Sequence, residues 1–332
     1  MTVSRSAEAH LLALPPDPSL ARGARNALAS ALRLKAGDSL VLLVERSREA
    51  IGASFLREAH DLSLETRTYI VDPKQAQSPA FVNRLAIHLK DAAGSVLVAS
   101  SSLDAEFRRR ICIHDDARRH AHMVGVTEAM MRQSMRVDYA EVHALGERLI
   151  ERLGASRTVH VTTGPRTTLT MELGEQLRWH NGSGVLTAPG FTNLPGGEVF
   201  TCPQRVDGAF RADGGVWTPT GRMHGLTIEV ERGRVVRGPK ELMEPLENHA
   251  NGTRIGQIAL GTNIGVLTPI GAMLQDLKMP GFHLIIGYSC PELTGATWDS
   301  DVMVPVLCRR PDVYLDGEPV MIRGRYSRDL LR

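Results

Sequence analysis

Short apolar runs of strand length alternate with helical spacing through the first half of the chain. Residues 40–44 (Leu-Val-Leu-Leu-Val) form a continuous apolar run, and residues 50–60 follow with helical spacing. Residues 66–71 and 95–99 repeat the strand pattern, and residues 123–126 suggest a fourth strand. Continuous apolar strands separated by helices are typical of a parallel sheet that is covered on both faces. The pattern therefore predicts a Rossmann-like α/β layer.

A helix with both end signals marks the expected domain boundary. Asp138 is a candidate N-cap and Gly154 a candidate C-cap, with apolar residues at helical spacing between them. After it, hairpin signals at residues 231–233 and at Asp316-Gly317 indicate a strand-rich α+β region. A chain of 332 residues exceeds the usual size of a single core. We therefore expect a Rossmann-like α/β domain at residues 1–155 and a strand-rich α+β domain at residues 156–332.

Composition excludes several classes of partner. The 39 Lys and Arg against 37 Asp and Glu give a net charge of +2, which offers no footprint for nucleic acid. No stretch approaches the roughly 18 apolar residues of a membrane span. The four cysteines are widely spaced, which argues against a zinc knuckle and a disulfide framework. We expect a cytoplasmic protein that binds neither nucleic acid nor membrane.

The familiar catalytic motifs are missing from the sequence. Glu45-Arg46-Ser47 stands after the first apolar run, where a dinucleotide-binding domain would have G-x-G-x-x-G. There is also no Walker loop, no H-E-x-x-H and no G-x-S-x-G. His120 and His122 place two imidazoles on one strand face, and without a nearby carboxylate we interpret them as a polar strand edge.

Four segments of the second half carry a family resemblance. They are Asn193-Leu-Pro-Gly-Gly-Glu-Val-Phe200, residues 255–263 (Ile-Gly-Gln-Ile-Ala-Leu-Gly-Thr-Asn), residues 282–287 (Phe-His-Leu-Ile-Ile-Gly) and residues 310–318 (Arg-Pro-Asp-Val-Tyr-Leu-Asp-Gly-Glu). In this order they resemble the aminopeptidase T family of metallopeptidases, which shares looser forms of them with the 2,5-dihydroxypyridine dioxygenases. The resemblance implies the aminopeptidase T fold and a homodimer.

The same resemblance implies a metal site that has lost most of its ligands. Glu198 and His283 fall on ligand positions that this sequence retains. Gln257 stands at a glutamate position, and Met303 and Pro305 stand at the histidine and aspartate of an H-x-D pair. An amide, a thioether and a proline are poor donors for a hard divalent ion, which prefers carboxylate oxygen or imidazole nitrogen. We therefore expect no metal cofactor.

A displaced site is the alternative. If the strand extends backwards from Pro305, Asp299 and Asp301 share a face with Met303 because side chains alternate with period two. Asp301 would then join Glu198 and His283 to hold zinc, manganese or iron.

These observations lead to two functional hypotheses, beside the third possibility of a purely structural or assembly role. In the first, the protein is a catalytically silent homologue that binds a peptide or amino-acid-like ligand through Glu198, Gln257, His283, Trp298 and Asp301. It would serve partner enzymes in a peptide-modification (natural-product) pathway. Glu198 either meets an α-amino group or pairs internally with His283, and Trp298 is either a packing residue or a ligand platform. In the second hypothesis, the displaced site supports a metal-dependent aminopeptidase or a ring-cleaving dioxygenase.

Overall fold

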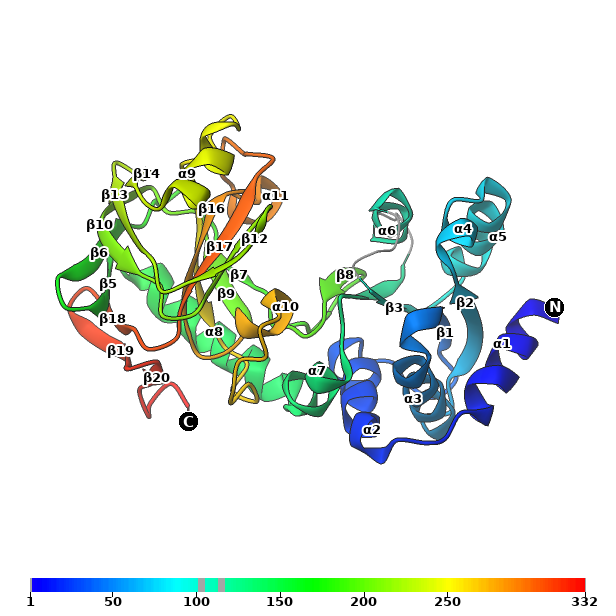
Figure 1. Ribbon diagram of the computed structural model, residues 1–332. Coiled ribbons are helices and arrows are strands. Elements are labelled where there is room, and N and C mark those ends of the chain that lie inside the picture. Colours follow the sequence, from blue (N-terminus) through cyan, green and yellow to red (C-terminus); the bar gives the residue numbers. More distant parts are fainter. Residues whose placement is uncertain (1, 101–104, 113–116, 332) are drawn as a thin grey trace. The chain divides into compact units, whose positions relative to one another are not determined.

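The computed structural model describes residues 2–100, 105–112 and 117–331, which form two compact units (Figure 1). The first unit comprises Met1–Glu141 and Gly184–Gly196, and the second comprises Val142–Ser183 and Gly197–Arg332. This division differs in two segments from the boundary between residues 155 and 156 that the sequence predicts. Most of α8 (Tyr139–Ala155) belongs to the second unit, and residues 184–196 return to the first.

The leucines of α8 explain why most of this helix belongs to the second unit. Leu145, Leu149 and Leu153 recur every four residues on one helix face, and all three are buried in the core of the second unit. Asp138 caps the helix as predicted, since its carboxylate accepts a hydrogen bond from the backbone of Ala140 at 2.9 Å. Gly154 is not the C-cap, because the helix continues to Ala155.

The first unit is built on a parallel sheet with the strand order β2-β1-β3-β4-β8. The strands are β1 (Ser39–Glu45), β2 (Glu65–Val71), β3 (Gly94–Ala99), β4 (Arg119–Val124) and β8 (Gly190–Asn193). The first three match their predictions, whereas the fourth begins at Arg119, before the predicted run. The parallel α/β layer is therefore confirmed.

The prediction that His120 and His122 form a polar edge is wrong. Strand β4 is not at the edge of the sheet. It pairs with β3 on one side and with β8 (residues 190–193) on the other. His120 is fully buried, and its Nδ1 lies 2.9 Å from Ser95 Oγ. Its Nε2 lies 3.4 Å from His122 Nδ1, and burial together with the charge of Arg108 lowers the pKa of His122 to about 4. His120 therefore belongs to the interior, and His122 is half-buried beside it.

Helices flank this sheet, and α3 packs directly on β1. A Cβ atom at Gly52 would lie 2.5 Å from the Val44 side chain, so glycine allows this close approach. The helices of the first unit are α1 (Thr2–Ala13), α2 (Pro18–Arg25), the π-helical η1 (Asn26–Ala31), the 3-10 turns η2 (Arg46–Arg48) and η3 (Ser134–Arg136), α3 (Glu49–Asp61), α4 (Pro73–Ala76), α5 (Pro79–Lys90), α6 (Ala105–Cys112) and α7 (Glu128–Arg132).

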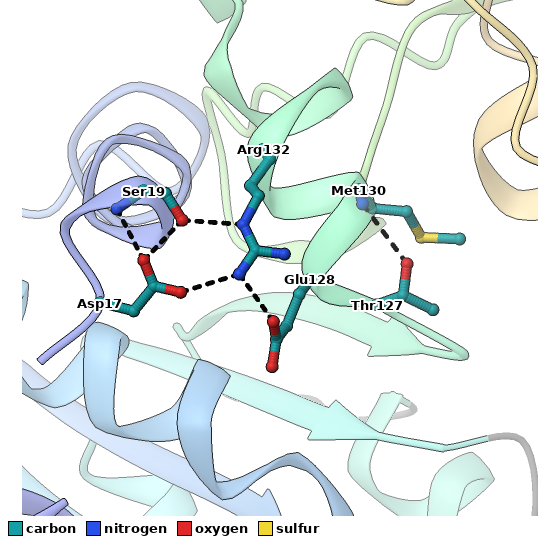
Figure 2. Close-up of polar contacts among 6 residues, drawn as sticks. All are labelled: Asp17, Ser19, Thr127, Glu128, Met130 and Arg132. Atoms are coloured by element: carbon teal, nitrogen blue, oxygen red, sulfur yellow. Dashed lines mark hydrogen bonds and ion pairs between the residues drawn. The ribbon is translucent and has the colours of Figure 1, made fainter. Parts of the chain in front are cut away.

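A polar cluster joins the start of α2 to α7 (Figure 2). Arg132 donates hydrogen bonds to Asp17 at 2.8 Å, to Glu128 at 2.7 Å and to Ser19 Oγ at 2.8 Å. Asp17 is also the N-cap of α2, and its bonds from Ser19 and Arg132 lower its pKa. Thr127 caps α7 through the backbone of Met130. The bonds of Arg132 to Asp17 and Ser19 therefore tie the start of α2 to α7, whose first turn is capped separately by Thr127.

The second unit contains two antiparallel sheets. One has the strand order β14-β13-β10-β6-β5-β18-β19-β20 and the other the order β12-β11-β17-β16-β15-β9-β7. The strands are β5 (Thr158–Gly164), β6 (Thr167–Glu172), β7 (His180–Asn181), β9 (Glu198–Thr201), β10 (Arg205–Arg211), β11 (Gly215–Thr218), β12 (Gly221–His224), β13 (Thr227–Glu231), β14 (Arg234–Arg237), β15 (Ile255–Gly261), β16 (Gly281–Gly287), β17 (Met303–Cys308), β18 (Asp312–Leu315), β19 (Glu318–Ile322) and β20 (Arg325–Tyr326). Three short helices accompany them in the described residues, α9 (Lys240–Glu247), α10 (Met273–Asp276) and α11 (Pro291–Thr294).

Both predicted hairpins form. The turn between β13 and β14 has positive φ angles at Arg232 (50°) and Gly233 (76°), and the turn between β18 and β19 has them at Asp316 (47°) and Gly317 (91°). Two consecutive positive φ angles are the signature of the tight turn that suits twisted strands. The strand-rich α+β character of the second half is therefore confirmed.

One apolar face of each antiparallel sheet, together with α8, encloses the core of the second unit. The second sheet contributes Val199, Leu260, Phe282 and Val306 among others, and the first contributes Val161 and Phe210. The residues between these positions point to the opposite face of the second sheet. In the described part of the chain, no helix is long and apolar enough to cross a bilayer.

Candidate functional site

The five positions at which the family resemblance places metal ligands lie on one face of the second sheet, opposite the core; they are Glu198, Gln257, His283, Met303 and Pro305. Residues that are directly opposite in adjacent antiparallel strands share a face. The register pairs Ala259 with both Phe200 and His283, and pairs Ile285 with both Gln257 and Pro305. His283 and Ile285 are two residues apart on β16, so both pairings lie on the same face. Glu198 lies two residues before Phe200, and Met303 two residues before Pro305, so they share this face as well.

Glu198 is held by two nitrogen groups. Lys278 Nζ forms an ion pair with Glu198 Oε1, and His283 Nε2 lies 3.3 Å from Oε2. Only 18% of the Glu198 side chain is exposed, and 10% of the Lys278 side chain. Burial raises the pKa of Glu198, but the charge of Lys278 and the hydrogen bond from His283 outweigh this and lower it to about 2. Glu198 is therefore an internally paired carboxylate at neutral pH.

His283 is almost completely buried and lies against this carboxylate. Burial lowers the pKa of His283, although its hydrogen bond to Glu198 opposes the effect. A neutral ring donates its Nε2 proton to Glu198, so Nδ1 carries the lone pair. In the described part of the chain, this Nδ1 has no hydrogen-bond partner.

Lys278 is the residue of this site that the sequence did not reveal. It lies between Leu277 and Met279, which are both buried, and is itself 8% exposed. A lysine between two buried apolar residues is a signal, because lysine is rarely buried unless it is paired. The backbone fixes its position, since its carbonyl accepts a hydrogen bond from Asn263 and its N–H donates to Gln275.

The other three positions offer little to a metal ion. The Gln257 amide donates to the carbonyl of Tyr288 at 3.1 Å. Met303 is 42% exposed at the start of β17, and Pro305 has no side-chain donor. Both oxygens of Glu198 are already engaged. A hard divalent ion needs several oxygen or imidazole donors, so this donor set does not fit one.

The displaced site is not formed. Strand β17 begins at Met303, so Asp299 and Asp301 precede the strand and do not continue its alternation. The Asp299 carboxylate accepts hydrogen bonds from Ser289 N and Oγ at 2.8 and 3.1 Å, which holds the segment in a loop. Asp301 is exposed. Among the described residues, no three or more His, Cys, Asp and Glu side chains form a group that could hold a metal, so Asp301 does not join Glu198 and His283.

Trp298 lies in a different part of the second unit. Its ring stacks against the guanidinium of Arg254, whose Cζ is 3.8 Å from the ring centroid. Both residues line a pocket of about 960 Å³ to which Glu198, Gln257 and His283 do not contribute. The structure therefore separates Trp298 from the other predicted ligand-binding residues.

Cys202 lines the same pocket, and the three cysteines whose side chains the structure describes are free. Cys202, Cys290 and Cys308 are unpaired and buried, and burial raises the pKa values of Cys202 and Cys290 to about 11. The side chain of Cys112 lies outside the described residues.

Comparison with known proteins shows what this chain is similar to. The family model of the thermophilic metalloproteases (M29) matches residues 129–301, just over half of the chain. Wild-type AmpT from Thermus thermophilus has 20% identity and a TM-score of 0.68, over 93% of this chain and 98% of that one. The 2,5-dihydroxypyridine dioxygenase from Pseudomonas putida KT2440 has 16% identity and a TM-score of 0.67, over 96% of this chain and 100% of that one. No curated protein matches. At these identities, the two solved structures establish a shared fold.

Proposed function

The chain belongs to the thermophilic metalloprotease (M29) family, and we propose that it is a catalytically silent member that binds a peptide or amino-acid-like ligand. One observation carries this proposal. One carboxylate oxygen of Glu198 is paired with Lys278, and the other lies near His283. Gln257, Met303 and Pro305 occupy the other three ligand positions and are poor donors for a hard divalent ion. Both carboxylate oxygens of Glu198 are thus occupied by contacts within the protein.

Electrostatics supports the loss of metal-dependent chemistry. A divalent ion that approached Glu198 would have to displace the ammonium group of Lys278 and would meet its positive charge at close range. Repulsion between like charges is strong in a partly buried site, where water screens it poorly. With Lys278 in place, Glu198 acts as a structural counter-ion.

Ligand binding is the function that this arrangement leaves open. Glu198 is already paired, so a ligand amino group would have to compete with Lys278 for it. Trp298, in contrast, lies in the wall of a large pocket. Delivery of the ligand to partner enzymes of a peptide-modification pathway is part of the same proposal, as are the homodimer and the cytoplasmic location.

Metal analysis tests the proposal. The purified protein is stripped with a chelator, resupplied separately with Zn²⁺, Mn²⁺ and Fe²⁺, desalted and analysed for metal content. It is then assayed with aminoacyl-p-nitroanilides and, for oxygen uptake, with 2,5-dihydroxypyridine. We expect far less than one ion per chain and no metal-dependent turnover.

The variant His283→Ala is the matched control for adventitious metal. Trace metal on the surface would be the same in wild type and variant. Near-stoichiometric metal that disappears in His283→Ala, together with turnover, would instead establish an active metalloenzyme and defeat the proposal.

A further inference from the structure

Arg254 and Trp298 form a fixed pair in the wall of the 960 Å³ pocket. The N–H of Arg254 donates to the carbonyl of Asn251 at 2.9 Å, and its own carbonyl accepts from Gly287 at 2.8 Å. On the other side of the pair, the carbonyl of Trp298 accepts a hydrogen bond from Ser289 Oγ. The backbones of both residues are therefore tied to their surroundings, and the indole supports one face of the guanidinium.

The guanidinium of Arg254 has no anionic partner in the described part of the chain. It makes no hydrogen bond and no ion pair there, and the ionisable groups whose charges act on its pKa are Arg234 and Cys202. Burial and the charge of Arg234 lower the pKa of Arg254, because no carboxylate compensates for its loss of water. A half-buried, oriented and unpaired arginine is suited to bind an anion through two parallel N–H donors.

The rest of the wall indicates which kind of anion fits. It carries the exposed residues Glu172, Glu175 and Arg157, and the indole of Trp179. Neither glutamate pairs with Arg254, so the opposite charges lie apart in one pocket. The wall thus combines two guanidinium groups, of Arg157 and Arg254, with two carboxylates, which favours a ligand that carries both a negative and a positive group over a phosphate dianion. The volume is at the upper end of the range for small-molecule sites, roughly 300–1,000 Å³, and accommodates more than one amino acid.

We propose that this pocket binds a peptide by its C-terminal carboxylate, which pairs with Arg254, while a basic group of the peptide meets Glu172 or Glu175. Trp298 keeps the arginine in place, and Trp179 offers apolar surface to the peptide between its charged ends. The inference rests on the proposed peptide-binding function and specifies the class of ligand and the end of the chain that is recognised.

The pocket is separate from the group formed by Glu198, Lys278 and His283, called here the Glu198 cluster, so the two sites can be tested independently. Glu198 begins β9, whereas the pocket is lined by Cys202, which follows the end of that strand. Four residues of strand correspond to about 13 Å. Substitutions at Arg254 therefore leave the contacts of Glu198, Lys278 and His283 in place.

The test uses a pair of tetrapeptides, Lys-Ala-Ala-Ala with a free C-terminus and the same peptide amidated, titrated into the full-length protein by calorimetry. We expect the free acid to bind and amidation to weaken binding roughly ten- to hundredfold, as expected for loss of a charge-assisted hydrogen-bond pair. Arg254→Gln should weaken binding of the free acid by a similar factor and remove the difference between the two peptides. Arg254→Lys should retain part of that difference.

Three further measurements define the controls. Arg234→Gln removes the neighbouring arginine, which does not line the pocket, and should keep the preference for the free acid. The double variant Glu172→Gln, Glu175→Gln should lose the advantage of Lys-Ala-Ala-Ala over its fully acetylated form. Circular dichroism of each variant checks that the fold is unchanged.

Several results would overturn the inference. Equal binding of free and amidated peptide, or a preference that survives in Arg254→Gln, would refute it while leaving peptide binding as a function. Tighter binding of inorganic phosphate at Arg254 would identify a different ligand class and refute it as well. No binding of either peptide at millimolar concentration would count against both proposals, whereas metal-dependent turnover would defeat the proposed function alone.

Discussion

Replacing Lys278 by methionine tests whether the Glu198 cluster is a closed structural unit. In the wild type, lowering the pKa of Glu198 from 4.5 to about 2 corresponds to about 3 kcal/mol of stability. Because the pKa is lowered in the folded state, this stability is present above about pH 4.5 and is lost as the pH falls towards 2.

The variant Lys278→Met removes the main group that keeps Glu198 ionised. Burial then dominates and raises the pKa of Glu198, so the ionised form becomes a buried and poorly compensated charge. We expect a loss of about 3–5 kcal/mol at neutral pH, the usual cost of breaking a buried pair. In the variant, the pH dependence of the free energy of unfolding has the opposite sign to that in the wild type, because a raised folded-state pKa makes stability fall as the pH rises. The difference between wild type and variant should therefore shrink between about pH 7 and about pH 4.5.

Urea unfolding followed by tryptophan fluorescence measures this effect. Trp179, Trp217 and Trp298 are the only tryptophans, and all belong to the second unit, so the signal reports the unit that contains the cluster. The double variant Glu198→Gln, Lys278→Met should recover most of the lost stability, since neither charge remains. An equal loss at both pH values, or no recovery in the double variant, would show that Lys278 acts by packing alone and refute the argument.

Three other outcomes follow from the site. The triple variant Gln257→Glu, Met303→His, Pro305→Asp should bind Zn²⁺ in excess of wild type by elemental analysis, because it restores hard donors on one sheet face; unchanged metal content would contradict the register. Asp301→Asn should alter neither metal content nor the urea midpoint, since the side chain is exposed and outside the cluster; a lower midpoint would show an unrecognised contact. Trp298→Ala should weaken binding of free Lys-Ala-Ala-Ala several-fold in the same calorimetric titration, as expected for loss of a cation–π platform, and unchanged affinity would exclude that role.

Local periodicity was sufficient to predict much of the fold. The continuous apolar run at residues 40–44 predicts a strand buried on both sides, and β1 is one. The Asp316-Gly317 pair predicts a tight hairpin because such a turn needs two residues at positive φ, and the structure has them. The ordered motifs predicted the family, which the match over residues 129–301 confirms. These features depend on residues close together in the chain, so the sequence alone carries them.

The remaining features depend on contacts between distant segments. Lys278 reaches Glu198 across 80 positions of sequence, and only the pairing of β9, β15 and β16 brings them together. Asp301 does not lie with Glu198 and His283, because Asp299 binds Ser289 and strand β17 starts later than the alternation suggested. The sequence determined which side chains share a sheet face, since alternation is a property of each strand. Only the tertiary structure decided which of them meet, since a contact depends on the register between strands and on the loops that set it.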